Sequence, residues 1–133
     1  MRFIFGMFIV LHGLVHLLYS GQSMRYFQLQ PGMLWPDGSW IFSRLLDNGA
    51  ARNLASISLI LVAFGLIVGG IGIIASQAWW RPVVVGAAAF SSIVYIFFWN
   101  GRIENLDAQG AVGILIDMAI LLAVLIFRWL PTK

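Results

Sequence analysis

Four long apolar stretches dominate the pattern of hydrophobic and polar positions along this chain. They cover residues 3–19, 53–75, 82–99 and 108–127, and polar, glycine or proline residues separate them. A helix needs roughly 20 mostly apolar residues to cross the hydrocarbon core of a bilayer. The pattern therefore predicts an all-α integral membrane protein, a four-transmembrane-helix bundle that forms a single domain over residues 1–133.

The ends of these stretches support the assignment. Trp79 and Trp80 come shortly before Pro82, a residue that suits the first turn of a helix. Tryptophan and tyrosine are enriched at membrane–water interfaces. Because His12 and His16 interrupt the first stretch, we interpret it as a span and not as a signal peptide.

The one long connection covers residues 21–52, where two prolines and several glycines exclude a continuous helix. Residues 39–46 place four apolar side chains on one helical face and Arg44 off that face. They predict a short amphipathic surface helix on the membrane, which Asn48-Gly49 would stop. The alternative is a cap that packs over the end of the bundle.

The composition agrees with a membrane protein. Of the 133 residues, 61% are hydrophobic and 10% are charged, and the mean hydropathy is +0.93. A soluble domain of this size would expose much of its chain and carry about a quarter of charged residues. We therefore expect the surface to face lipid.

The net charge of +3 does not indicate nucleic-acid binding. Eight Lys and Arg residues are scattered singly along the chain against five acidic residues, so no basic run could hold a phosphate backbone. Cations at the ends of spans instead help to predict how the spans are oriented in the membrane, and they attract anionic lipid headgroups. The two sides carry equal numbers of cations, and the acidic residues of one side favour placing both termini in the cytoplasm.

Polar residues within the spans are distributed unevenly with depth. At about 1.5 Å of rise per residue, His12 and Asp117 lie near the membrane midplane, and other polar residues lie toward the side away from the termini. An acid at this depth costs about 2.5 to 3.5 kcal/mol, so Asp117 should have a partner, and His12 is the expected one. We predict a polar pocket in this half of the bundle, with the candidate residues His12, His16, Ser58, Ser91, Ser92, Tyr95, Asn100 and Asp117.

Three interpretations of these residues remain open. The His12–Asp117 pair could simply tie helices together, because polar contacts between helices are common in membrane bundles. The residues could instead contact a quinone, pigment or lipid whose tail stays in the membrane. A proton-coupled transporter is the weakest interpretation, because it needs polar groups across the whole membrane and one half of the spans offers no ionisable residue.

The sequence offers few signs of other chemistry. It has no cysteine, so thiolate metal sites and cysteine nucleophiles are excluded. His12 and His16 lie on one helix face, so they do not supply both axial ligands of a heme. A metal site would need Asp117 as a third ligand. We therefore expect neither heme nor metal. Phosphate-binding loops, nucleophile elbows and paired catalytic carboxylates are missing, and Glu104 and Asp107 are expected to be solvated loop charges.

Several glycines recur at spacings that allow helices to approach closely. We expect most of them to pack inside the bundle and one to face another subunit, and we expect Gly69→Leu to disturb assembly. The helix-packing candidates are Gly6, Gly13, Gly65, Gly69, Gly110 and Gly113.

Three short motifs carry a resemblance to a known family: His12-Gly13-x-x-His16, Trp79-Trp80-Arg81-Pro82 and Ile116-Asp117. The chain resembles the DoxX-like group of small four-span bacterial membrane proteins over all four spans, but not over residues 21–52. The resemblance implies a bacterial cytoplasmic membrane, a polar corner at Gly13, His16 and Asp117, and association with membrane redox assemblies such as a thiosulfate:quinone oxidoreductase. Several relatives place Lys where this chain has His16.

Together these features favour a non-catalytic accessory or assembly subunit of a larger, bioenergetic membrane complex. Such a subunit would contact membrane lipids and either partner subunits or further copies of itself, and its polar corner would contact a quinone, pigment or lipid. The alternative is a small DoxX-like redox or lipid-modifying enzyme in which His12, His16 and Asp117 act on a lipid-soluble substrate.

Overall fold

The computed structural model describes residues 1–105 and 109–128, and every regular element within these ranges is a helix. Three of the helices are long and apolar enough to cross a membrane: α1 (Arg2–Ser23), α2 (Asn48–Ile74) and α3 (Trp80–Phe98). The described chain is therefore that of a helical integral membrane protein.

The fourth helical segment is shorter than the sequence predicts. Helix α4 (Ala111–Leu121) continues directly into the π-helical turn η3 (Leu122–Ile126), so the segment has 11 and then five residues. At about 1.5 Å per residue it extends about 24 Å, less than the roughly 30 Å of a bilayer core. It begins late because Gly110 adopts a left-handed φ of 104°, which ends the preceding turn. The predicted start of this span at residue 108 and the predicted loop charge Asp107 lie outside the described residues.

Helix α2 begins earlier than predicted, at Asn48 instead of residue 53. Its N-cap is Asp47, whose carboxylate accepts a hydrogen bond from the Ala50 backbone N–H at 2.6 Å. Asn48 and Gly49 therefore begin a helix, whereas the sequence analysis expected them to end one.

The amphipathic helix expected at residues 39–46 does not form. This segment contains a single 3₁₀ turn, η1 (Phe42–Arg44). The Phe42 ring stacks on the Phe98 ring at the end of α3, with 4.6 Å between the centroids. The segment is thus a cap packed on the bundle, which was the alternative.

Hydrogen bonds to the end of α3 explain why this segment is not helical. The Trp40 indole N–H donates to the carbonyl of Ile96 at 2.7 Å, and the Ser39 hydroxyl donates to the carbonyl of Phe97. These bonds satisfy carbonyls that the end of a helix leaves without intrahelical partners. They hold the segment close to α3.

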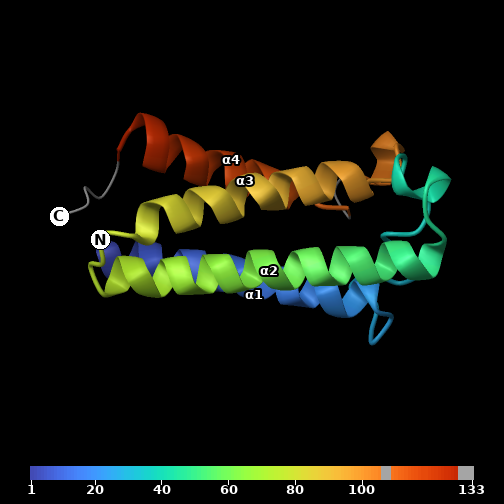
Figure 1. Cartoon of the computed structure of the whole chain (residues 1–133), viewed down its shortest axis with the longest axis horizontal. Helices are drawn as coiled ribbons and strands as arrows, with labels where there is room; N and C mark the ends of the chain where they lie inside the picture. The colour runs from blue at the N-terminus through green and yellow to red at the C-terminus, as the bar shows by residue number, and fades with distance from the viewer. Residues whose placement is uncertain (106–108, 129–133) are drawn as a thin grey trace.

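The connections between helices define two ends of the molecule. Figure 1 shows the N-terminus, the α2–α3 connection and η3 at one end of the long axis, which we call the terminal end. The α1–α2 and α3–α4 connections lie at the other end, which we call the loop end. Successive helices pack together, α1 on α2, α2 on α3 and α3 on α4, whereas α1 and α4 are not among the extensively packed pairs of the described chain.

Two apolar clusters fill the bundle. One, which includes Leu66 and Trp80, occupies the half toward the terminal end, and the other, which includes Leu59 and Phe98, occupies the half toward the loop end. All of these side chains are at most 2% exposed. By contrast, large apolar side chains such as Phe64 and Leu115 are more than two-thirds exposed on the outside, as expected of a surface that faces lipid.

Glycines permit the closest approach between helices. A Cβ on Gly70 would lie 2.7 Å from the backbone oxygen of Gly6, a distance that would force α1 and α2 apart. Each predicted packing glycine faces another part of the chain: Gly6 and Gly13 face α2, Gly65 and Gly69 face α3, and Gly110 and Gly113 face the ring of Tyr95.

Candidate functional site

Five polar side chains meet in the interior of the bundle, and we call them the polar cluster. His12 and His16 come from one face of α1, Ser91 and Ser92 from α3, and Asp117 from α4. His16, Ser91 and Asp117 are fully buried, and the other two are at most 6% exposed. The spacing of the histidines explains this placement, because positions i and i+4 lie on the same side of a helix.

The hydrogen bond between His12 and Asp117 connects α1 with α4. His12 Nε2 lies 2.8 Å from Asp117 Oδ1, and Ser92 Oγ lies 3.5 Å from Asp117 Oδ2. The Ser92 hydroxyl also lies 3.1 Å from the Ala88 carbonyl. Because a hydroxyl has one proton, Ser92 donates to the carboxylate or to the carbonyl, but not to both at once.

The bonds of His16 define its tautomer. His16 Nδ1 lies 2.8 Å from the backbone oxygen of His12, and a carbonyl oxygen only accepts, so Nδ1 carries a proton. In the neutral ring, Nε2 is then an acceptor, and it lies 2.6 Å from the Ser91 hydroxyl, which donates to it. Both ring nitrogens of His16 are therefore used within the chain.

The arrangement of Ser91 and His16 has two of the parts of a nucleophilic hydrolase. A hydroxyl lies within hydrogen-bond distance of an imidazole, and the His12 carbonyl fixes the orientation of that imidazole. A further part is access for a substrate. Neither of the two cavities described below has a member of the polar cluster in its lining.

The polar cluster also contains the three residues considered for a metal. The ligand atoms of His12, His16 and Asp117 lie within 4.8 Å of one another. However, the His12–Asp117 bond and the two bonds of His16 occupy these atoms, so a metal would have to replace bonds that are already made. The expectation of no metal stays a prediction.

The remaining predicted residues lie around the polar cluster or outside it. The Tyr95 ring lies 5.6 Å from that of His16 and packs on Tyr19 and Trp35, so it covers the loop-end side of the cluster. The Ser58 hydroxyl donates to the carbonyl of Leu54 in its own helix at 2.8 Å. Asn100 lies in the α3–α4 connection and lines a cavity at the loop end.

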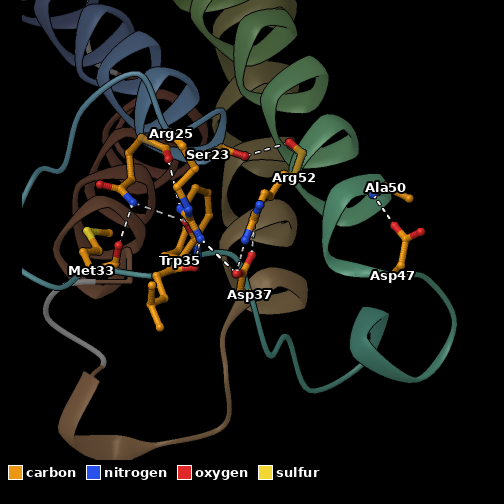
Figure 2. Close-up of polar contacts among 10 residues, drawn as sticks. Ser23, Arg25, Met33, Trp35, Asp37, Asp47, Ala50 and Arg52 are labelled. Atoms are coloured by element: carbon orange, nitrogen blue, oxygen red, sulfur yellow. Dashed lines mark hydrogen bonds and ion pairs between the residues drawn. The ribbon is translucent and has the colours of Figure 1, made fainter.

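A second polar network at the loop end was missed by the sequence analysis, which used its charges only for topology. Figure 2 shows Asp37 between the guanidinium groups of Arg25 and Arg52. Arg52 Nε donates to Asp37 Oδ1 at 2.7 Å, and an Arg25 nitrogen lies 3.1 Å from Asp37 Oδ2. Burial alone would raise the pKa of Asp37, but the hydrogen bond from Arg52 and the charges of Arg25 and Arg52 outweigh it and lower the pKa.

The same network fixes the backbone of the α1–α2 connection. Arg25 donates to the carbonyl of Trp35 at 2.7 Å and to that of Leu34, and the Gln22 amide donates to the carbonyl of Met33 at 3.1 Å. The sequence feature that could have indicated this network is the presence of two acids, Asp37 and Asp47, among several arginines in a connection rich in glycine and proline. Sequence spacing does not show which of these charges pair, because the turns between them decide it.

Two of the cavities that the described residues line bear on ligand binding. The loop cavity, of about 580 Å³, lies between the α1–α2 and α3–α4 connections, with Asn100, Arg102 and Gln109 on one side. The terminal groove, of about 330 Å³, lies between α1 and α4 and is almost wholly apolar. Phe8 lines this groove and stacks on the ring of His12, with 6.4 Å between the centroids.

No protein-family model, curated protein or solved structure matches this chain.

Proposed function

We propose that this protein is a four-span, non-catalytic accessory or assembly subunit of a larger membrane complex, with both termini in the cytoplasm of a bacterium. The main support is the state of the polar cluster. Its side chains are buried and hydrogen-bonded to one another, and none of them lines a described cavity. Groups arranged in this way order helices and do not meet a substrate.

The position of the polar cluster supports a structural role. It joins α1 to α4, two helices that are not extensively packed on each other, and it joins both to α3. Polar contacts between membrane helices contribute about 0.6 kcal/mol on average and up to about 1.7 kcal/mol. Several such bonds in one layer hold α4 in place.

The outside of the bundle supports contact with partner helices or lipid. Large apolar side chains cover the outer faces, among them Phe3, Phe64 and Leu115, each at least 64% exposed. Gly86 is exposed on α3, and a Cβ there would meet nothing within 4 Å, so another helix could approach closely at this point. The resemblance to DoxX-like proteins supports a bioenergetic or redox complex. A quinone, pigment or lipid would contact the chain at the loop cavity or the terminal groove.

The second candidate is a small membrane enzyme, and the 2.6 Å contact between Ser91 and His16 favours it. An enzyme function requires an opening in the bundle through which a lipid-soluble substrate reaches Ser91. It also requires the Ser91 hydroxyl for every turnover, whereas a structural role needs it only for stability.

A pair of serine variants separates these two functions. Ser91→Ala removes the donor to His16, whereas the matched control Ser58→Ala removes a hydroxyl that bonds only within α2. The readouts are the amount of folded protein in native membranes and the activity of the complex that co-purifies with it, expressed per assembled complex. For an accessory subunit, Ser91→Ala lowers the amount of assembled complex and leaves its specific activity unchanged. Loss of specific activity at an unchanged amount of complex would favour the enzyme.

A further inference from the structure

The loop cavity presents hydrogen-bond donors whose partners are missing from the described chain. The Asn100 side-chain oxygen accepts from the Arg102 backbone N–H at 3.0 Å, and the Gln109 side-chain oxygen accepts from the Asn100 backbone N–H at 3.0 Å. These two bonds fix the orientation of both carboxamides, because a backbone N–H only donates. Both NH₂ groups are therefore left without partners among the described residues.

One further donor lines the same cavity, and an unpaired donor is buried beside it. The Trp35 side chain is 1% exposed, and its indole N–H has no hydrogen-bond partner. The Arg102 guanidinium also faces no acceptor within the described ranges, and Arg102 is exposed on the rim.

Several acceptors of the cavity wall are already engaged. Both carboxylate oxygens of Asp37 accept from Arg52. The carbonyls of Met33, Leu34 and Trp35 accept from Gln22 and Arg25. Among the charged side chains that line the cavity or pair with its wall, the guanidinium groups are those of Arg25, Arg52 and Arg102, and the one carboxylate is that of Asp37.

We propose that the loop cavity binds the phosphate group of an anionic phospholipid through the donors of Asn100, Arg102 and Gln109. A phosphate oxygen accepts hydrogen bonds and donates none when ionised, which matches a wall of unpaired donors. The volume of about 580 Å³ is in the range of small-molecule sites.

The surroundings favour a lipid as the source of the phosphate. Leu34 lines the cavity and is 63% exposed, and Tyr26 and Trp40 are exposed in the same connection. Exposed apolar and aromatic side chains at the end of membrane spans are typical of the headgroup region. The cavity therefore opens where headgroups are concentrated. This inference does not rest on the accessory role, because it uses none of the polar cluster.

The first test compares lipids on the purified, delipidated full chain by native mass spectrometry. Phosphatidylglycerol should bind about tenfold more tightly than phosphatidylcholine, because only the former keeps a net negative charge. The double variant Asn100→Asp with Gln109→Glu keeps both accepting oxygens but replaces each NH₂ donor by a carboxylate oxygen. It should lose this preference, whereas Arg44→Gln, which removes an exposed cation outside the cavity lining, should keep it. Equal binding of the two lipids, or an unchanged preference in the double variant, would overturn the proposal.

A second measurement is made on the wild-type protein, and variants serve only to assign its resonances. The side-chain ¹H–¹⁵N resonances of Asn100 and Gln109, assigned with Asn100→Asp and Gln109→Glu, should move downfield when phosphatidylglycerol is added to the wild-type protein and stay in place with phosphatidylcholine. An unmoved signal at saturating phosphatidylglycerol would refute the site. If inorganic phosphate alone produces the same shift and displaces the lipid, the oxyanion site is supported and the free ion is its ligand. If inorganic phosphate has no effect, the lipid headgroup is the ligand.

Discussion

Asp117 shows how one acid is accommodated inside a helical membrane protein. Its two carboxylate oxygens face His12 and Ser92 in a layer that excludes water. The sequence alone suggested the pair, because both residues fall at the same depth and an isolated acid there is costly. The structure contains this bond at 2.8 Å, but the depth of the residues did not indicate that the cluster would lie outside both described cavities.

Two substitutions of Asp117 should differ clearly in their effect on stability. Asp117→Leu leaves the His12 Nε2–H buried without an acceptor, so we expect the free energy of unfolding to fall by about 1 to 3 kcal/mol. Asp117→Asn keeps an accepting oxygen and should cost less than about 1 kcal/mol. Thermal unfolding in detergent micelles measures both. Equal losses for the two variants would show that the carboxylate charge, and not the hydrogen bond, is what the bundle needs.

The stability of the loop end should depend on pH through Asp37. Its pKa is lowered in the folded protein, so its stabilising contribution is complete above its ordinary value of about 4 and is lost as the pH falls through the lower folded value. Thermal unfolding of wild type and Asp37→Asn should therefore differ at about pH 6 and differ less at about pH 3. A difference that does not change with pH would contradict the role of the Arg25–Asp37–Arg52 network.

At the scale of helices, close packing at glycine decides which elements lie together. A Cβ on Gly69 would lie 2.5 Å from a methyl carbon of Val84, so Gly69 belongs to the contact between α2 and α3 within the chain. We expect Gly69→Leu to lower the free energy of unfolding by about 1 to 3 kcal/mol through overpacking. The matched control is Gly86→Leu, which should change it by less than about 0.5 kcal/mol because a Cβ there meets nothing. Unfolding curves that coincide for these two variants would show that the α2–α3 contact tolerates the extra volume.

The apolar pattern predicted the three long helices because their length and hydropathy are local properties. It failed at residues 39–46, where the Ser39 and Trp40 side chains bond to the end of α3, a contact between parts of the chain far apart in sequence. It also overestimated the last helix, since a hydropathy pattern does not register the left-handed φ of Gly110. The hydropathy pattern contains no information about long-range hydrogen bonds or about the backbone conformation of an individual residue.

At the scale of the whole molecule, the proposed four-span topology would place the two flanks of α4 on opposite sides of the membrane. The chain has no cysteine, so single cysteines can be introduced without background labelling. Ile103→Cys, before α4, should react with a membrane-impermeant maleimide from outside intact cells, and Arg128→Cys, after η3, should react only after the membrane is opened. Gln77→Cys, in the exposed α2–α3 turn, is the cytoplasmic reference. Reaction of Ile103→Cys and Arg128→Cys from the same side would show that the short segment of about 24 Å does not cross the bilayer.

The accessory role predicts that this protein is bound to other polypeptides in its membrane. The most direct measurement is native mass spectrometry of the protein released gently from that membrane, with both partner chains and retained small molecules recorded. We predict recovery in a larger assembly with other polypeptides. Recovery as a free chain of 14.8 kDa, or as a small homo-oligomer that holds a lipid-soluble adduct and no other polypeptide, would contradict the account.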